Sequence, residues 1–291
     1  MHRFPVLVLI VAATACAQTS PGRNFSGAEA LVLTGKAVAF GPRPSGSPAI
    51  AKMRAFIRQQ LASCGCEVSA DSFTGRTPDG PVPMENIIAK FPGKSGRAIA
   101  ITGHYDTKKL PNFVGANDGG SSTGFLLEMA VALKGRPRVD DIYLVFFDGE
   151  EAVHDWSDTD SLYGSRHLAA KWTADGTIRR LKALINVDMI GDKIFRLAWE
   201  TNSAPSLRNL VWDTGDAMGY SAAFPRQGGP IEDDHMPFIN AGVRALDLID
   251  FESANSFWHT PEDAMDKLGE QGFDVLGLVL LKVIPELERE K

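Results

Sequence analysis

The feature that most constrains the fold is a series of four short apolar segments, separated by stretches that have the apolar spacing of helices. A segment that is apolar at nearly every position has to be covered on both of its faces, as the strands of parallel sheets are. Alternation of such strands with helices is typical of α/β domains, whose helices lie on both faces of one central sheet. The four segments are residues 97–102, 142–147, 183–189 and 245–249.

Two further segments, in which polar and apolar residues alternate, complete the predicted sheet. Residues 67–73 and 84–91 form a predicted hairpin across a loop at 75–83. We therefore expect an α/β fold with a mixed, mostly parallel central sheet. The predicted helices are residues 26–40, 47–63, 119–133, 162–171, 207–218 and 269–288, and Pro285 is expected to kink or end the last of them.

Length, composition and charge favour one globular domain. The chain has 291 residues, of which 44% are hydrophobic, so it can bury a large core. Length alone would permit two domains, but the alternation of strands and helices continues without a linker, which favours a single one. The formal net charge of −6 argues against a nucleic-acid partner. The sequence carries no signal for an oligomeric state.

The amino terminus has the pattern of an export signal. A short basic head is followed by an apolar run at residues 4–15, which is too short to span a bilayer, and by the small residues Ala15-Cys-Ala17. We predict a signal peptide at residues 1–17, a catalytic domain at 18–291, and a secreted or periplasmic location. The second interpretation is a lipoprotein modified at Cys16, but the leucine usual in a lipoprotein box is missing. No later segment is apolar for long enough to cross a membrane.

Two cysteines, Cys64 and Cys66, remain in the predicted mature chain. An exported protein could oxidise them to a disulfide, but a ring closed across a single residue would be strained. The redox state of the pair stays open at this point. Neither cysteine has a further Cys or His nearby in sequence, so a separate structural zinc site is not expected.

Acidic and imidazole side chains gather where the predicted strands end. Ligands of open α/β sheets bind outside the carboxyl ends of the strands. Each of these residues alone has an ordinary explanation as a helix cap, a turn residue or a hydrogen-bonded pair. Together they indicate a metal site, because zinc takes about four nitrogen, sulfur or carboxylate ligands and would offset the repulsion between neighbouring carboxylates. The candidates are His104, Asp106, Asp118, Glu150, Glu151, Asp188 and His259.

The motifs around these residues resemble those of the zinc-aminopeptidase superfamily of secreted exopeptidases. The matching segments are Gly103-His-Tyr-Asp106, Gly115-Ala-Asn-Asp-Gly-Gly-Ser-Ser122, the Glu150-Glu151 pair, Asn186-Val-Asp-Met-Ile-Gly191 and His259-Thr260. The resemblance implies a zinc-exopeptidase-like fold. In two-zinc members of that superfamily, the matching residues place His104 and Asp188 on one metal, Glu151 and His259 on the other, and Asp118 between them.

A more specific resemblance is to the animal-type, zinc-dependent glutaminyl-peptide cyclotransferases, and it extends from about residue 84 to 267. In the two-zinc peptidases a short glycine-rich segment follows the glutamate pair almost at once. Here that segment is stretched to Glu150-Glu-Ala-Val-His-Asp-Trp-Ser-Asp-Thr-Asp-Ser-Leu-Tyr-Gly-Ser-Arg-His-Leu-Ala169, as in the cyclotransferases. Glu232-Asp-Asp-His-Met-Pro-Phe238 and Phe257-Trp-His-Thr260 also match that family.

This second resemblance implies conversion of the N-terminal glutamine of peptides or proteins into pyroglutamate, with release of ammonia. It implies one Zn2+ bound by Asp118, Glu151 and His259, with Glu150 as general acid and base. Asp188 and Asp233 would form a carboxylate pair beside the reacting amide, and Trp156 and Trp258 would wall the pocket.

Two other functions stay open on the sequence. His104 and Asp188 are both present, so a secreted two-zinc aminopeptidase is the runner-up, in which His104 would bind the second metal and Asp106 would bind or support it. A non-catalytic binding domain with the peptidase fold is the third interpretation. One departure from the cyclotransferases is Asp247, which stands where that family usually has a histidine and puts the hydrogen bonds around the carboxylate pair in question.

Overall fold

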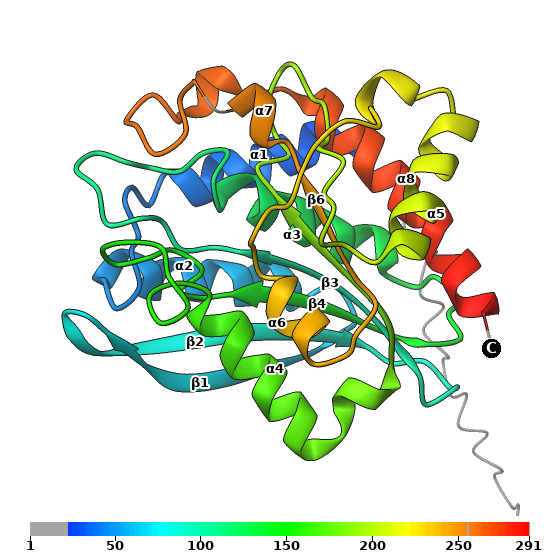
Figure 1. Ribbon diagram of the computed structural model, residues 1–291, viewed down its shortest axis with the longest axis horizontal. Coiled ribbons are helices and arrows are strands. Elements are labelled where there is room, and N and C mark those ends of the chain that lie inside the picture. Colours follow the sequence, from blue (N-terminus) through cyan, green and yellow to red (C-terminus); the bar gives the residue numbers. More distant parts are fainter. Residues whose placement is uncertain (1–22, 255, 291) are drawn as a thin grey trace, which may run out of the picture.

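The centre of the computed structural model is one six-stranded sheet in the strand order β1-β2-β4-β3-β5-β6 (Figure 1). The structure describes residues 23–254 and 256–290, so the predicted signal peptide and Cys16 lie outside the described residues. Pairing is antiparallel between β1 and β2 and between β2 and β4, and parallel elsewhere, which confirms the predicted mixed sheet. The strands are β1 (Glu67–Thr77), β2 (Gly80–Phe91), β3 (Ala98–His104), β4 (Asp141–Phe147), β5 (Leu181–Asp188) and β6 (Ala245–Ile249).

Helices cover both faces of this sheet. One face carries α1 (Gly27–Val38), α2 (Pro48–Leu61), α3 (Gly120–Leu133), α5 (Pro205–Ala217) and α8 (Glu270–Arg289), and the other carries α4 (Tyr163–Asp175) and the short α6 (Met236–Asn240). Short helical turns at Thr177–Arg180, Ser221–Ala223, Phe251–Ala254 (α7) and Met265–Lys267 complete the chain. No helix in the described part of the chain is both long and apolar enough to cross a bilayer.

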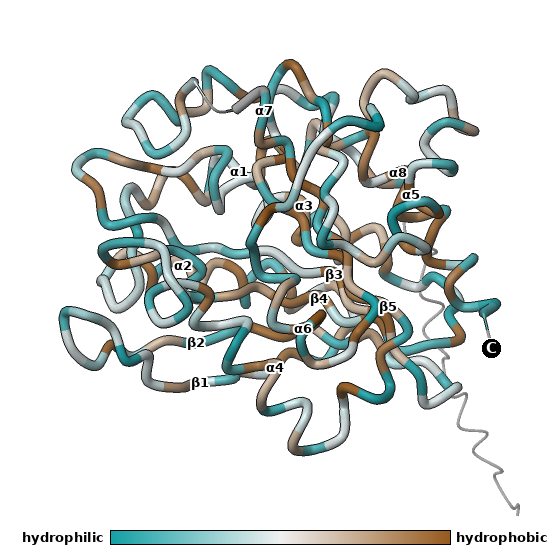
Figure 2. The backbone as a smooth tube through the Cα atoms, in the orientation of Figure 1, coloured by the Kyte–Doolittle hydropathy of each residue, from teal (hydrophilic) through white to brown (hydrophobic). Residues whose placement is uncertain are grey.

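The apolar strands supply side chains to two separate cores. In β4, Ile142, Leu144 and Phe146 belong to the larger core under α1, α2, α3, α5 and α8, whereas Val145 and Phe147 belong to the core under α4 and α6. Figure 2 shows the central strands as the hydrophobic part of the backbone trace, with hydrophilic loops around them. Burial on both faces explains why the strands are apolar without alternation.

Capping residues set the starts of the first two helices. The hydroxyl of Ser26 accepts a hydrogen bond from the backbone N–H of Glu29, and that of Ser47 accepts one from Ile50. Pro48 is the first residue of α2, where its missing N–H costs nothing. These two helices begin within a residue of their predicted starts.

The loop predicted at residues 75–83 is wrong, and one of the two outcomes expected at Pro285 is excluded. Residues 75–83 do not form a loop, because β1 and β2 pair without interruption from Glu67 opposite Lys90 to Thr77 opposite Gly80. Pro81 and Pro83 are tolerated because this part of β2 pairs with β1 alone, and β4 joins β2 only from Ile87 onward. Helix α8 does not end at Pro285 but continues to Arg289, one residue beyond its predicted end, because its final turns are held in the core by buried apolar side chains, Ile284 and Leu287 among them. A kink at Pro285 stays a prediction.

The cysteines are free thiols in the structure. Cys64 is buried at the end of α2, and its Sγ lies 3.4 Å from the backbone oxygen of Gln60. Cys66 is half-buried, with its Sγ 3.7 Å from the backbone oxygen of Leu61. Each thiol therefore donates its own hydrogen bond to α2.

Helix α1 packs unusually closely on α3 at Gly124. A methyl group at this position would collide with the side chain and backbone of Thr34 and with the backbone oxygen of Ala30. Glycine allows the two helix backbones to approach, and the contact helps to hold α3, whose start carries part of the site described below.

We expect Gly124→Val to destabilise the protein by about 1–3 kcal/mol, because the added side chain forces the two helices apart. The measurement is the midpoint of urea unfolding. Gly229→Ala is the matched control, since Gly229 has open space around its Cα. Equal midpoints for the two variants would contradict the close helix contact.

Candidate metal and catalytic site

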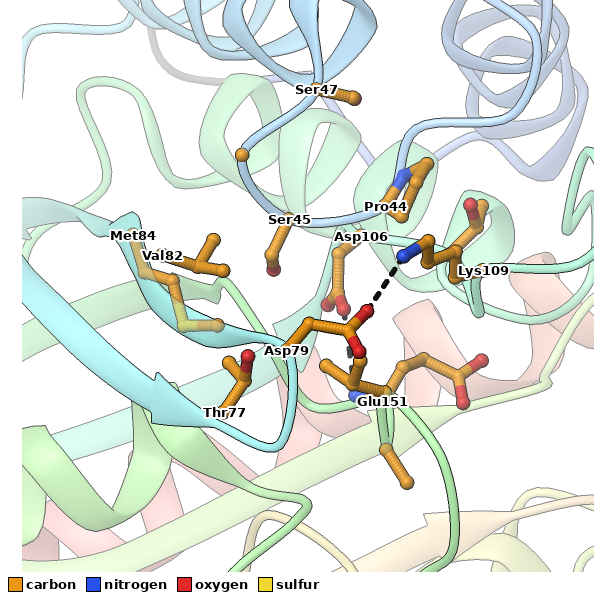
Figure 3. Close-up of a pocket in the computed structure, with 14 residues that line it drawn as sticks. Pro44, Ser45, Ser47, Thr77, Asp79, Val82, Met84, Asp106, Lys109 and Glu151 are labelled. Atoms are coloured by element: carbon orange, nitrogen blue, oxygen red, sulfur yellow. Dashed lines mark hydrogen bonds and ion pairs between the residues drawn. The ribbon is translucent and has the colours of Figure 1, made fainter.

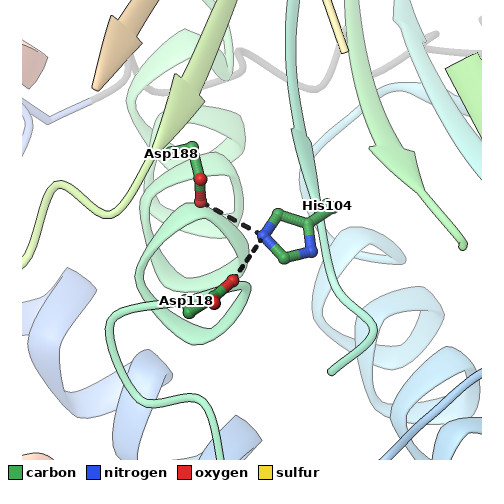
Figure 4. Close-up of side chains that lie close together, drawn as sticks. All are labelled: His104, Asp118 and Asp188. Atoms are coloured by element: carbon green, nitrogen blue, oxygen red, sulfur yellow. Dashed lines mark hydrogen bonds and ion pairs between the residues drawn. The ribbon is translucent and has the colours of Figure 1, made fainter. Parts of the chain in front are cut away.

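Two clusters of possible metal ligands lie at the carboxyl edge of the sheet and share Asp118. In the first, the Nε2 atom of His104 lies 3.1 Å from an oxygen of Asp118 and 3.1 Å from an oxygen of Asp188 (Figure 4). In the second, the Nε2 atom of His259 lies 3.3 Å from the other oxygen of Asp118 and 3.3 Å from Glu151. In each cluster the candidate ligand atoms lie within 4.8 Å of one another.

The sheet topology explains this convergence. His104 is the last residue of β3, Asp188 is the last of β5, and Glu151 follows β4, so three neighbouring parallel strands deliver one residue each. Asp118 comes from the loop before α3 and His259 from the loop before α8. Parallel strands end at the same edge, which is why the sequence could predict the gathering.

The loop that carries Asp118 is fixed by Asp263. The carboxylate of Asp263 accepts hydrogen bonds from the backbone N–H groups of Asn117 (2.7 Å) and Asp118 (3.1 Å). Gly119 follows at a φ of 76°, and a side chain there would meet the ring of His104. Burial, with the charge of Asp118 adding, raises the pKa of Asp263 to about 7. Asp263 could not be predicted from the sequence, because its role depends on a contact with a loop 145 residues away.

Asp106 supports the glutamate pair from behind. Its carboxylate accepts hydrogen bonds from the backbone N–H groups of Glu150 (3.2 Å) and Glu151 (3.4 Å) and lies 3.4 Å from the Nδ1 atom of His104. Asp106 belongs to neither ligand cluster. Of the two roles considered for it, its contacts therefore fit support of the ligands.

Glu150 is buried next to the clusters but is not part of them. Its carboxylate lies 3.9 Å from the Nδ1 atom of His104. Burial raises the pKa of Glu150 well above its usual value, and the charges of Glu151 and Asp233 add to this rise, whereas His104 opposes it. A buried carboxyl group with a raised pKa can hold and release a proton near neutral pH.

The carboxylates around Asp118 are poorly compensated by the protein alone. Burial, with the charge of Asp118 adding, raises the pKa of Glu151 to about 7. Burial would also raise the pKa of Asp118, but hydrogen bonds from His104 and His259 lower it. One buried oxygen of Asp118 has no hydrogen-bond partner among the described residues and lies 3.3 Å from the Nε2 atom of His259. Two carboxylates and one imidazole converging in this way fit a zinc ion.

A second acidic group is organised by Asn186. The side-chain amide of Asn186 donates hydrogen bonds to Asp233 (3.0 Å) and Asp247 (3.2 Å). The hydroxyl of Thr102 donates to the amide oxygen of Asn186 (2.8 Å) and so fixes which way the amide points. Burial, with the charges of Asp233 and Asp188 adding, raises the pKa of Asp247 well above its usual value. Asp247 therefore takes part in the hydrogen bonds around Asp233, at the position where the cyclotransferases usually have a histidine.

Both predicted pocket tryptophans line one cavity of about 560 Å3 that also contains Glu150, Glu151, Asp188 and Asp233. Trp156 and Trp258 are 41% and 36% exposed, which is unusual for such large apolar side chains. The indole of Trp258 stacks on the ring of His259, with centroids 3.9 Å apart and an angle of 23° between the planes. The cavity therefore combines an aromatic wall with a buried acidic floor, a typical composition for a binding site.

A smaller hollow of about 300 Å3 lies on the other side of Glu151 (Figure 3). Asp79, at the tip of the β1–β2 hairpin, accepts a hydrogen bond from the ammonium group of Lys109 (2.7 Å) and lies 2.7 Å from the Nε2 atom of His154. These contacts tie the hairpin to the loops that follow β3 and β4. The hollow contains neither ligand cluster in full, so it is not the candidate site.

The loop after Glu151 is held in shape by Asp160. The buried carboxylate of Asp160 accepts hydrogen bonds from the backbone N–H groups of Val153 and His154 (2.8 Å each) and from the hydroxyl of Tyr163 (2.7 Å). The backbone N–H of Leu162 donates to the backbone oxygen of Glu150 (2.8 Å), so the loop closes on itself. Trp156 therefore sits on a fixed segment although its ring is exposed.

We expect Asp160→Ala to loosen this loop, because three donors lose their acceptor, at a cost of about 1–3 kcal/mol. Hydrogen–deuterium exchange at residues 153–157 measures the effect and should become faster. The control is Asp158→Asn, since Asp158 is in the same loop and exposed, and only its backbone oxygen accepts a hydrogen bond. Unchanged exchange in Asp160→Ala would show that the loop is held by other contacts.

Comparison with known proteins places the chain in a family. The family model for peptidase family M28 matches residues 86–284. The glutaminyl-peptide cyclotransferase of Drosophila melanogaster is 31% identical over 267 residues, which cover 82% of this chain and 75% of that protein. The glutaminyl-peptide cyclotransferase of Bos taurus is 30% identical over 287 residues, with 82% and 76% covered.

Solved structures similar to this chain include members of the same group of proteins. A glutaminyl cyclase from an Acidobacteriales bacterium matches with a TM-score of 0.86 and 40% identity over 96% of this chain and 99% of that one. The glutaminyl cyclase of Porphyromonas gingivalis matches with a TM-score of 0.82 and 31% identity over 90% and 98%. The resemblance inferred from the sequence is thereby confirmed. The chain belongs to peptidase family M28 and, within it, to the glutaminyl-peptide cyclotransferases.

Proposed function

We propose that this protein is a zinc-dependent glutaminyl cyclase, which converts the N-terminal glutamine of peptides or proteins to pyroglutamate and releases ammonia. The observation that carries the proposal is the position of Glu150. It is buried in the same cavity as Trp156 and Trp258, next to the Asp118, Glu151 and His259 cluster but outside it. The names of the relatives, glutaminyl-peptide cyclotransferase and glutaminyl cyclase, support the same reaction.

Asp118, Glu151 and His259 would hold one zinc ion. Two carboxylates and one imidazole leave a coordination position open, as catalytic zinc sites do. When bound, zinc supplies a Lewis acid that polarises the side-chain amide of the substrate glutamine. Lys108 assists from the protein side, because its backbone N–H donates to an oxygen of Glu151 at 3.1 Å and orients the carboxylate.

Glu150 would move the proton. Cyclisation joins the α-amino nitrogen to the side-chain amide carbon of the glutamine and breaks the bond from that carbon to its amide nitrogen. The attacking amine loses a proton to Glu150, and Glu150 returns a proton to the departing nitrogen, which leaves as ammonia. The pKa of Glu150, raised by its burial, suits a group that must both accept and return a proton.

Asp188 and Asp233 would stabilise the positive charge that develops on the nitrogen that becomes ammonia. Both line the cavity, and burial raises the pKa of Asp188 to about 6, with the charge of Asp233 adding and His104 opposing. Because Asn186 fixes Asp233, the pair is held without a bound substrate. Trp156 and Trp258 would lie against the glutamine and exclude water.

The second candidate is a two-zinc aminopeptidase. The observation that favours it is the His104, Asp118 and Asp188 cluster, which would provide the second metal position. Metal analysis separates the candidates, since we expect about one zinc per chain and the alternative requires about two. Full activity after Glu151→Ala would show that the metal is not catalytic and would reopen the third interpretation, a metal-free binding domain. Export directed by a signal peptide at residues 1–17 stays a prediction from the sequence.

We expect Glu150→Gln to lower the kcat for cyclisation of Gln-initiated peptides by roughly 100-fold or more, because the amide cannot carry the proton. Zinc content should be unchanged, since Glu150 is outside the ligand cluster. Ammonia release and the accompanying loss of peptide mass measure the reaction. The wild-type control also tests the proposal itself, because release of free glutamine would indicate hydrolysis.

We expect zinc to raise the melting temperature more at about pH 8 than at about pH 5.5. Burial raises the pKa of Glu151 to about 7 and that of Asp188 to about 6, so without metal the folded protein keeps protons that the unfolded chain has lost. This stabilisation by protons is present at low pH and is lost as the pH rises through 6 and 7.

Zinc then replaces the missing positive charge at high pH, whereas it competes with protons at low pH. Thermal unfolding with added zinc or with a chelator at both pH values measures the difference. In Glu151→Ala the zinc-dependent rise should be largely lost. An equal rise at both pH values in the wild type would argue against binding by these carboxylates.

A further inference from the structure

A second cavity adjoins the catalytic one and has no role in the mechanism above. It has a volume of about 320 Å3 and lies between the loop after Glu151 and the start of α6. The two cavities share Trp156 and Glu232 in their walls. A peptide whose first residue fills the catalytic cavity can reach the second one with its next one or two residues, because each extended residue advances about 3.3–3.6 Å.

The walls of the second cavity are fixed before any ligand binds. The loop that forms one wall is held by Asp160, as described above, and by Arg166 of α4. The guanidinium group of Arg166 donates hydrogen bonds to the backbone oxygens of Asp158 and Ser161. These bonds occupy both terminal nitrogens of Arg166, so this side chain braces the loop. A fixed wall favours binding, because little conformational entropy is lost when a ligand arrives.

The free charges around the two cavities are negative. Glu232, in the shared wall, and Asp155, in the wall of the catalytic cavity next to Trp156, are exposed. Neither forms a hydrogen bond or ion pair through its carboxylate with any residue in the described ranges. Asp158 adds a third exposed acidic side chain in the wall of the second cavity.

The positive groups in the same walls already make contacts within the protein. The ammonium group of Lys108 donates to the backbone oxygen of Ala152 (3.2 Å) and lies 3.8 Å from Glu151. His154 is paired with Asp79. Arg166 keeps its positive charge, but both of its terminal nitrogens donate to backbone carbonyl groups. The exposed carboxylates of Asp155, Asp158 and Glu232 outnumber this one guanidinium group, so the walls favour an incoming cation over an incoming anion.

We propose that the second cavity binds the side chain of one of the two residues that follow the N-terminal glutamine, and that Glu232 and Asp155 make it favour lysine or arginine there. The apolar stem of a long basic side chain would pack on the exposed face of Trp156 while its charged end approaches Glu232. This inference rests on the proposed cyclase function and specifies its substrate class.

The test compares cyclisation of amidated tripeptides that differ in one charge. The set is Gln-Lys-Ala, Gln-Ala-Lys, Gln-Glu-Ala, Gln-Ala-Glu and the neutral Gln-Ala-Ala. We expect kcat/KM for the better lysine peptide to exceed that of its glutamate counterpart by about five- to tenfold, with the neutral peptide between them. Raising the salt concentration from about 0.05 M to about 0.5 M should reduce the ratio, because exposed charges are screened.

Variants of the cavity residues test whether the preference for lysine peptides arises in this cavity. Glu232→Gln and Asp155→Asn should each reduce the lysine-to-glutamate ratio by about threefold. Glu232→Lys should reverse the preference. The matched control is Glu67→Gln, which removes an exposed carboxylate at the start of β1, at the opposite edge of the sheet. Because Glu232 is exposed, its variants should keep the wild-type melting temperature.

Three results would overturn the inference while leaving the cyclase function intact. The first is equal kcat/KM for lysine and glutamate peptides in the wild-type protein. The second is a lysine preference that Glu232→Gln and Asp155→Asn leave as it is. A preference for glutamate peptides would instead assign the cavity to Arg166 and also contradict the inference. Failure of the wild-type protein to cyclise even Gln-Ala-Ala would contradict the proposed function itself.

Discussion

The structure depends on one electrostatic constraint, which is the concentration of buried carboxylates at the carboxyl edge of the sheet. Asp118, Glu150, Glu151, Asp188 and Asp233 all line one cavity. Carboxylates so close together in a protein interior cannot all be charged without a compensating cation or a bound proton. The two histidines provide part of the compensation, His104 between Asp118 and Asp188, and His259 between Asp118 and Glu151. A metal ion would supply the positive charge that is still missing.

The same constraint explains why adjacent glutamates can have different tasks. Successive residues after a strand point in different directions, so Glu151 turns toward His259 while Glu150 turns toward His104 and the floor of the cavity. Asp106 accepts hydrogen bonds from both backbone N–H groups and so fixes the backbone that carries the two side chains. A group that binds the metal has to lose its proton, whereas a group that transfers protons has to keep a raised pKa, and separation of the two side chains allows both.

The sequence was sufficient for the features that depend on local pattern. Apolar strands, helix caps and the residues at strand ends follow from periodicity and from the rule that parallel strands finish at one edge, so the sheet and the candidate ligands could be predicted. Features that depend on long-range contacts could not. Asp263 acts on a loop far away in sequence, and Thr102 orients Asn186 across two strands. The β1–β2 ladder through Pro81 and Pro83 was missed because composition favoured a loop there, while edge pairing tolerates proline.

The stretched loop after Glu151 links the chemistry to substrate choice. A loop of this length in water would have many conformations, and ordering it costs entropy. Here the hydrogen bonds to Asp160 within the loop offset the lost entropy, together with the hydrogen bond from Leu162 to Glu150 at the base of the loop. Because the backbone of Glu150 also anchors the loop, the position of Trp156 relative to Glu150 is set by the bond from Leu162 together with the contacts of Asp160. If the proposed function is right, a change near Trp156 would alter the pocket wall more than the candidate metal ligands, and this separation would allow substrate preference to vary while the reaction is kept.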